Sequence, residues 1–185
     1  MASDLAPFFS PEGVAIIGAS TNPQKLSHGI LKNMASYGFK GGIYPVNPSA
    51  KQILGLTAYP DVANVPDPVD LAVVVLPAPM TPGVLRACGE RGIKAVIIIS
   101  GGFREIGESG LALEQECYQI ANEYQMRLIG PNCVGTIDLF TGLNSTFIEG
   151  LPDQGGIGFL SQSGAVCGGV VDYIADKHVG FSHFA

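Results

Sequence analysis

The sequence predicts an α/β protein built on a doubly wound parallel sheet. Short apolar runs rich in valine and isoleucine recur along the chain, and segments with helical spacing separate them. The runs are continuously apolar rather than alternating, which is typical of parallel strands that are buried on both faces. No run of eighteen apolar residues occurs, so no membrane span is expected.

The expected elements follow in order along the chain. Strands are predicted at residues 14–17, 42–46, 71–76, 95–100 and 126–130. Helices are predicted over the stretches SHGILKNMASYG, PGVLRACGERG and LALEQECYQIANEY, which lie between them. Right-handed crossovers then place helices on both faces of the sheet.

Residues 131–152 lose this alternation, and a second unit is expected after them. The stretch LPDQGG leads into a strand at residues 157–160 and a helix from about Gly164 to Lys177. One strand with one helix cannot bury both of its faces, so the predicted domains are residues 1–150 and a truncated beginning of a second α/β domain at residues 151–185. The terminal stretch VGFSHFA is expected to start another strand, with Phe181 and Phe184 uncovered, which predicts self-association or a disordered tail.

Composition excludes several classes of protein. The formal net charge is −6 and the ten Lys and Arg residues are not clustered, so no nucleic acid is expected as a partner. The N-terminus has an acidic residue, Asp4, and lacks the apolar core of a signal peptide, which predicts a cytoplasmic protein. The four cysteines are widely spaced, so reduced thiols are expected and neither a metal site nor a disulfide framework.

The first candidate site is the turn in VAIIGASTNPQKLSHG. A strand, a turn of small residues and a helix start direct backbone N–H groups and the positive helix end toward an anion; the alternative is an ordinary tight turn. NAD is disfavoured because the turn lacks the G-x-G-x-x-G pattern and because the second strand ends in Asn47 and Pro48, with no acidic residue. Lys25 is either a phosphate ligand or a solvated lysine, and no chemistry is assigned to His28.

The second candidate site is the turn SQSGA. A serine hydrolase would need the pattern G-x-S-x-G, whereas Leu160 precedes Ser161 here, and no base with a partner carboxylate can be assigned. Helix capping by Ser161 or Ser163 is the simpler alternative.

Several segments together resemble one family. They are VAIIGAST, GFKGGIYPVNP, LGLTAYPDV, PVDLAVVVLPAP, GIKAVIIISGGFREIGESG, MRLIGPNCVGTIDLFTGLNSTF and GGIGFLSQSGAV. Their order and content resemble the NDP-forming acyl-CoA synthetases, of the ADP-forming acetate–CoA ligase type, whose CoA-binding half is similar to the α subunit of succinyl-CoA synthetase. The combination of GPNC, TGLNSTF and SQSGA is the specific part of the resemblance.

The resemblance implies a Rossmann-like CoA-binding domain followed by a flavodoxin-like domain. It implies that the CoA phosphates contact Gly18, Ala19, Ser20 and Thr21, with Lys25 as a cation. It also implies that the nucleotide is bordered by Val46, Asn47 and Pro48, and that the pantetheine arm passes Leu76, Pro77, Ala78, Ser100, Gly101 and Gly102. Members of the family often have basic residues at the positions of Thr21 and Ser49, and Lys51 is the candidate replacement for the second.

For the SQSGA turn, the resemblance implies a seat for a phosphorylated histidine. The phosphoryl group would be held at a helix N-terminus by Ser161, Ser163, Gly164 and Ala165. The histidine and its acidic partner are expected downstream of residue 185, and His183 does not correspond to it, so no catalytic residue is expected in this chain. Cys133 is expected near the junction of the domains as a packing thiol.

The function implied is conversion of an acid, CoA and ATP to acyl-CoA, ADP and phosphate, through an acyl phosphate and a phosphohistidine. The partners implied are a small carboxylic acid, an ATP-grasp domain or subunit, ATP or ADP with Mg²⁺, and an oligomeric assembly. Two alternatives stay open: the regulatory region of a protein lysine acetyltransferase, and a noncatalytic nucleotide-binding module. The SQSGA turn favours the synthetase over the noncatalytic module.

Overall fold

The computed structural model describes residues 5–185, and its larger sheet is parallel. The strand order is β2–β1–β5–β6–β7, with bounds Gly42–Val46, Gly13–Ile17, Leu71–Val74, Ala95–Ile98 and Arg127–Ile129. A strand is present at each of the five predicted places, which confirms the doubly wound α/β class. Asp4 is one of the features from which a cytoplasmic protein is predicted, and it lies outside the described residues.

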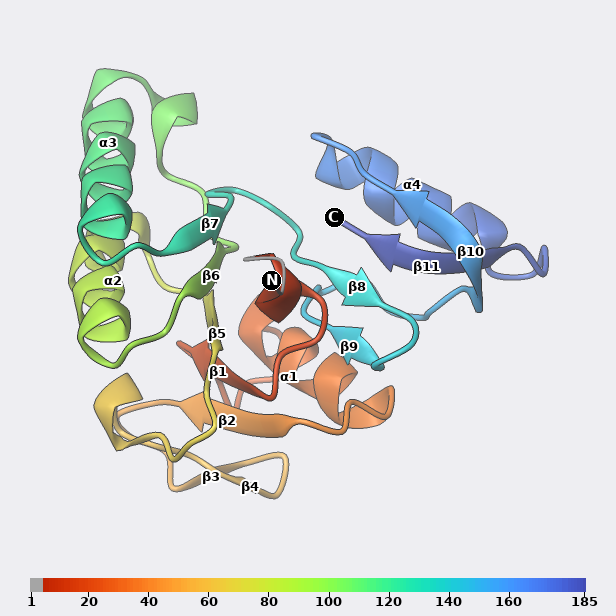
Figure 1. Cartoon of the computed structure of the whole chain (residues 1–185), viewed down its shortest axis with the longest axis horizontal. Coiled ribbons are helices and arrows are strands. Elements are labelled where there is room, and N and C mark those ends of the chain that lie inside the picture. Colours follow the sequence, from red (N-terminus) through yellow and green to blue (C-terminus); the bar gives the residue numbers. More distant parts are fainter. Residues whose placement is uncertain (1–4) are drawn as a thin grey trace.

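Helices cover both faces of this sheet (Figure 1). Helix α1 (Leu26–Ser36) packs on one face, while α2 (Thr81–Glu90) and α3 (Glu108–Glu123) pack on the other. Along β1, Val14 and Ile16 face α1, whereas Ala15 and Ile17 face α2 and α3. Every residue of the strand is therefore buried, which explains why the run is continuously apolar.

The order of the strands creates a switch point at β1. The crossover from β1 to β2 leads to one side, and the connection from β2 to β5 returns to the other side of β1. In open α/β sheets, ligands bind outside the carboxyl ends of the strands at such a point. The loops that follow β1 and β5 are therefore the expected place of a ligand site.

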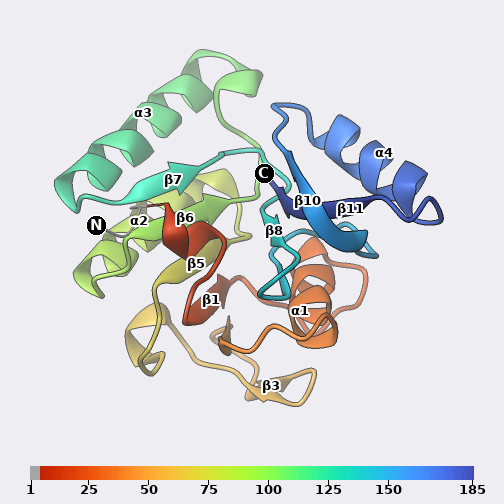
Figure 2. The same ribbon diagram turned by 45° about the vertical axis from the view of Figure 1, so that its right-hand side comes forward.

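A second, smaller sheet lies beside the first (Figures 1 and 2). Its order is β10–β11–β8–β9, with bounds Asp153–Phe159, Gly180–Phe184, Ile137–Asp138 and Leu143–Asn144, and helix α4 (Gly164–Ile174) packs on it. The short strands β8 and β9 were not expected from the sequence. They combine with β10 and β11 across the expected boundary at residue 150, and the division into two domains stays a prediction.

The expectation that the terminal phenylalanines lack neighbours was wrong. Phe184 is fully buried and Phe181 is nearly so, and their rings stack with centroids 4.8 Å apart. They are covered by Ile137 of β8 and by α4, including Cys167. The predicted strand itself is confirmed as β11, and exposed apolar side chains lie instead at Leu160, Val166 and Tyr173.

A buried polar network ties the loop around β9 to helix α1. Thr136, Asn144, Ser145 and Thr146 have no exposed surface. The Asn33 amide on α1 donates to the Thr146 carbonyl at 2.8 Å and to the Ile148 carbonyl at 2.9 Å. The TGLNSTF stretch therefore links the two sheets.

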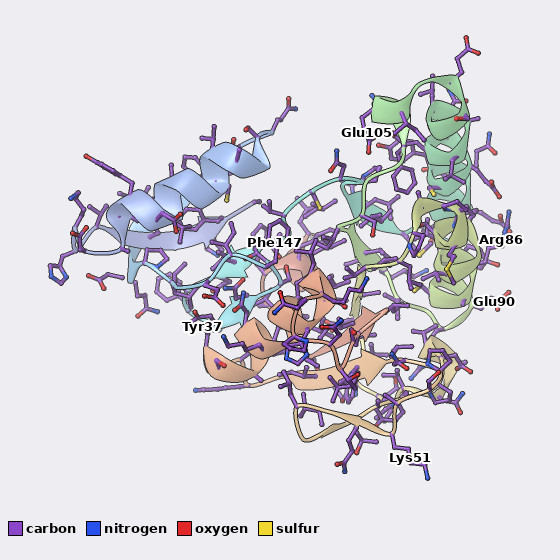
Figure 3. The ribbon with its side chains drawn as sticks, turned by 180° about the vertical axis from the view of Figure 1, so that it is seen from behind. Tyr37, Lys51, Arg86, Glu90, Glu105 and Phe147 are labelled. Atoms are coloured by element: carbon purple, nitrogen blue, oxygen red, sulfur yellow. The ribbon has the colours of Figure 1, made fainter. Side chains whose placement is uncertain are left out.

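The remaining elements are short. They are the β3–β4 hairpin (Gln52–Ile53 and Leu56–Thr57) and the 3-10 turns η1 (Ala6–Phe8), η2 (Val62–Asn64), η3 (Ala78–Met80) and η4 (Arg104–Ile106). Lys51 extends from the hairpin away from the molecule (Figure 3). Within residues 5–185, no helix has the length and apolar character that crossing a membrane requires.

Candidate functional site

The turn after β1 passes very close to the turn after β5. Gly18 has a positive φ of 90°, and a Cβ at this position would lie 2.5 Å from the Val75 carbonyl oxygen. A residue with a side chain would therefore be strained and would also clash with backbone. The Gly18 N–H donates to the Val46 carbonyl at 3.1 Å, which binds the turn to the end of β2.

Helix α1 begins at this turn without a side-chain cap. Its N-cap residue, Lys25, makes no capping hydrogen bond, and the Lys25 side chain is exposed. Uncapped amides and the helix dipole favour an anion at such an end. The turn and the helix end border a cavity of about 400 Å³, lined by Gly18, Ala19, Ser20, Lys25, Leu26, Ser27, Asn47, Pro48, Val75 and Leu76.

An apolar cavity of about 300 Å³ adjoins the first one. The two cavities share Gly18, Pro48 and Leu76. The rest of its lining is Ile17, Val46, Pro60, Asp61, Val62, Met80, Gly83, Val84 and Ala87. These residues come from β1, β2, η3, α2 and the segment at η2, so the tertiary structure brings them together from separate parts of the sequence.

A larger cavity of about 760 Å³ separates the five-stranded sheet from α4. It is lined by Leu26 and Gly101 from the part built on the five-stranded sheet (the first unit) and by Phe147. It is also lined by residues of α4, which packs on the smaller sheet (the second unit); they include Gly164 and Ala165. Phe147 lies between the two units in the view from behind (Figure 3). Leu26 also lines the cavity at the turn after β1, so the two cavities adjoin at the start of α1.

A fourth cavity, of about 520 Å³, continues from this one. The two share Asn132, Cys133, Val134, Gln162 and Gly164. Ser161 also lines the fourth cavity, together with Ala185 and the η4 region. The four cavities therefore form a series from the apolar end at β2 to the SQSGA turn.

Two carboxylates shape the wall of the fourth cavity. Burial alone would raise the pKa of the Glu114 carboxyl, but hydrogen bonds from the Arg104 side chain (2.8 Å) and backbone N–H (3.2 Å), among others, outweigh it and lower that pKa. Glu105 accepts a hydrogen bond from the Gly102 N–H at 2.6 Å, and this bond lowers the pKa of Glu105. Glu105 thus fixes the turn after β6 from the η4 side (Figure 3).

The serines of the SQSGA turn differ in their contacts. The Ser163 hydroxyl caps α4 by accepting from the Val166 N–H at 3.4 Å, whereas Ser161 lines the fourth cavity. Cys133 donates to the Ile98 carbonyl at 3.3 Å, and burial raises the pKa of its thiol to about 11. This environment keeps the Cys133 thiol protonated and supports the expected packing role.

Most residues expected at a ligand line one of these cavities. Those that do are Gly18, Ala19, Ser20, Lys25, Val46, Asn47, Pro48, Leu76, Gly101, Ser161, Gly164 and Ala165. Those absent from the four linings are Thr21, Pro77, Ala78, Ser100, Gly102 and Ser163. The sequence interpretation missed Asn132 and Gln162, which line both cavities beside α4 and stand next to residues that it did single out, Cys133 and Ser161.

Comparison with known proteins identifies the family of the first unit. A family model described as "CoA binding domain" matches residues 12–138. The chain is 44% identical over 178 residues to the α subunit of acetate–CoA ligase [ADP-forming] II from Pyrococcus furiosus, covering 96% of this chain and 38% of that protein. It is 40% identical over 179 residues to 4-hydroxybutyrate–CoA ligase [ADP-forming] from Nitrosopumilus maritimus, covering 96% and 26%.

Solved structures extend the likeness to both units. The apo form of dinucleotide forming acetyl-coenzyme A synthetase 1 from Ca. Korarchaeum cryptofilum matches with a TM-score of 0.94 at 40% identity, over 98% of this chain and 39% of that chain. The chain thus spans about two fifths of the proteins it matches in these structures. It belongs to the CoA-binding domain family and corresponds to the CoA-binding, α-subunit-like part of the ADP-forming acyl-CoA synthetases.

Proposed function

We propose that this chain binds coenzyme A along the series of four cavities. The observation that carries the proposal is that neighbouring cavities share lining residues, from the apolar cavity at β2 to the SQSGA turn. An extended ligand with a flat base at one end, phosphates in the middle and a flexible arm suits this sequence of environments. The segments that carry these residues follow the order of the family that the chain resembles, with Thr21 and Ser49 in place of its frequent basic residues.

Each part of CoA has a proposed location. The phosphates bind at residues 18–21 and at the uncapped start of α1, with Lys25 as the cation. The nucleotide lies beside Val46, Asn47 and Pro48, where the apolar cavity accepts the base. The pantetheine arm then passes Leu76 and Gly101 toward α4, and Pro77, Ala78, Ser100 and Gly102 shape the turns along its way.

In the complete protein, we propose that this unit serves an acid–CoA ligase that forms ADP. The SQSGA turn would receive a phosphorylated histidine, with Ser161, Gly164 and Ala165 at the cavity and Ser163 holding the start of α4. ATP and Mg²⁺ would bind to an ATP-grasp domain or subunit, and the acid substrate is a small carboxylic acid. An oligomeric assembly is part of the same proposal.

We propose that none of the three histidines in this chain is the one phosphorylated during turnover. We therefore expect the purified chain to form no acyl-CoA from an acid, CoA and ATP. The measurement is thioester formation with acetate, 4-hydroxybutyrate and other short acids. Turnover by the chain alone would contradict this part of the proposal.

The direct test is calorimetric titration with CoA, dephospho-CoA and NAD at fixed salt. We expect saturable binding of CoA and weaker binding after Lys25→Ala, by about tenfold, the loss of about 1.4 kcal/mol of charge-assisted interaction. Lys40→Ala is the matched control, because Lys40 is exposed and lies before the amino end of β2.

Three outcomes are informative. Binding of CoA that weakens without the 3′-phosphate supports the proposed location of the phosphates. Tight binding of NAD without binding of CoA would instead make the first unit a dinucleotide site. If Lys25→Ala and Lys40→Ala bind CoA equally, Lys25 is not a phosphate ligand.

A further inference from the structure

Two side chains hold two consecutive carbonyl groups of the turn after β1. The Asn47 amide nitrogen lies 2.7 Å from the Ala19 carbonyl oxygen, and His28 Nδ1 lies 2.8 Å from the Ser20 carbonyl oxygen. A carbonyl oxygen only accepts, so Nδ1 of His28 carries the hydrogen. The turn is therefore fixed from β2 on one side and from the first turn of α1 on the other.

Asn47 is itself held in one orientation. Its side-chain oxygen accepts from the Ser49 N–H at 2.8 Å and from the Ala50 N–H at 2.9 Å. Its backbone N–H donates to the Tyr59 carbonyl at 2.8 Å. These bonds determine which end of the amide is the donor toward Ala19.

Fixing a carbonyl also fixes the N–H of the next residue. In a planar trans peptide the C=O and the following N–H point in opposite directions. The bond from Asn47 to Ala19 thus directs the Ser20 N–H away from Asn47, and the bond from His28 to Ser20 directs the Thr21 N–H away from His28. Within residues 5–185, neither of these N–H groups has a protein acceptor.

We propose that Asn47 and His28 are positioning residues that pre-organise the phosphate-binding turn of this chain. By holding the Ala19 and Ser20 carbonyls, they present the Ser20 and Thr21 N–H groups to a CoA phosphate. The inference rests on the proposed CoA function and goes beyond it. The proposed function only places Asn47 beside the nucleotide, and it assigns no role to His28. Pre-organisation raises affinity by reducing the ordering that binding requires.

The first experiment measures CoA affinity by calorimetry for variants at both positions. His28→Leu and Asn47→Ala each lose one carbonyl contact and are expected to bind CoA about tenfold more weakly. His28→Asn is the conservative variant, because its amide nitrogen takes a place close to that of Nδ1, and it is expected to bind within about threefold of the native chain. The matched controls are His178→Leu and Asn122→Ala, two exposed positions outside the four cavities.

The second experiment follows the backbone amides by NMR during titration with CoA. In the native chain, the Ser20 and Thr21 amide protons are expected to shift downfield as they bond to phosphate. Asn47→Ala should reduce the shift of Ser20 most, and His28→Leu should reduce that of Thr21 most. This residue-by-residue pattern would not arise from general destabilisation, which urea unfolding of each variant measures separately.

The outcomes separate this inference from the proposed function. Absence of CoA binding by the native chain would overturn both. Binding of CoA by the native chain together with unchanged affinity in His28→Leu and Asn47→Ala would overturn the inference alone. Equal weakening by His28→Leu and His28→Asn, without the expected pattern of amide shifts, would also overturn it.

Discussion

At the scale of single residues, the turn after β1 requires glycine at position 18. Gly18 adopts a positive φ and packs against the Val75 carbonyl, so a side chain would be strained there and would also clash. Gly29, eleven positions along the chain, lies in α1, and a Cβ added to it would have nothing within 4 Å. The same substitution should therefore have opposite effects at the two glycines.

Gly18→Ala is expected to lower the free energy of unfolding by about 1–3 kcal/mol. Gly29→Ala is expected to raise it by about 0.5–1 kcal/mol, because alanine is the better helix former and has space here. Urea unfolding of both variants tests the pair. A stabilising Gly18→Ala would show that the turn relaxes more easily than its contacts indicate.

Glu114 is expected to make the free energy of unfolding depend on pH. Because the pKa of Glu114 in the folded chain lies below the ordinary value of 4.5, its ionised form stabilises the fold. That contribution is complete above the ordinary pKa and is lost as the pH falls through the lower folded value. Glu114→Gln should therefore reduce the dependence of the unfolding free energy on pH as the pH falls below about 4.5. An unchanged slope would assign the acid sensitivity to other carboxyls.

At the scale of elements, helix α1 contributes both to the proposed phosphate site and to the position of the loop that follows β9. Its start borders the proposed phosphate site, and its Asn33 holds the loop that follows β9. The same helix also contacts this loop through an exposed ion pair between Lys32 and Glu149 at 3.3 Å. The two contacts have very different energies because one is buried and the other is solvated.

Asn33→Ala leaves the Thr146 and Ile148 carbonyls without their shared donor. We expect a loss of about 1–3 kcal/mol in the free energy of unfolding. Lys32→Ala on the same helix should cost about 0.5 kcal/mol or less. Similar values for the two variants would mean that water replaces the Asn33 amide at little cost.

At the scale of the whole molecule, the second sheet is a unit with its own core. Phe181 and Phe184 pack with residues of α4 and β8, so the end of the chain is an ordered part of that core. The Ala185 N–H donates to the Phe159 carbonyl at 3.0 Å, which extends the pairing of β10 and β11. Leu160 and Tyr173 are exposed on the same unit, and association of copies stays a prediction that sedimentation measurements can test.

Phe184→Ala should destabilise the second sheet by about 3–5 kcal/mol, the usual cost of removing a buried aromatic ring. Hydrogen exchange should then show faster exchange in β10 and β11, while the five-stranded sheet keeps its protection. Equal loss of protection in both sheets would instead show that the two units unfold together.

Local patterns in the sequence were enough to predict the fold class, the places of the five strands of the larger sheet and their helices, and the family. Continuous apolar runs, helical spacing and motifs in contiguous residues such as GPNC and SQSGA can be recognised without tertiary contacts. Gly18, Lys25 and Asn47 could be predicted as ligand-binding residues for the same reason, since each belongs to a contiguous motif.

The meeting of distant segments depends on the tertiary structure. The two-residue strand β8 forms because β11 supplies its partner, and β9 pairs in turn with β8. Phe184 is buried because α4 and β8 cover it. The hydrogen bonds that fix the turn after β1 require Asn47 and His28 to arrive from different elements. A hydrogen bond across such a separation depends on the position of both segments in space, and the residue types of either segment alone do not specify it.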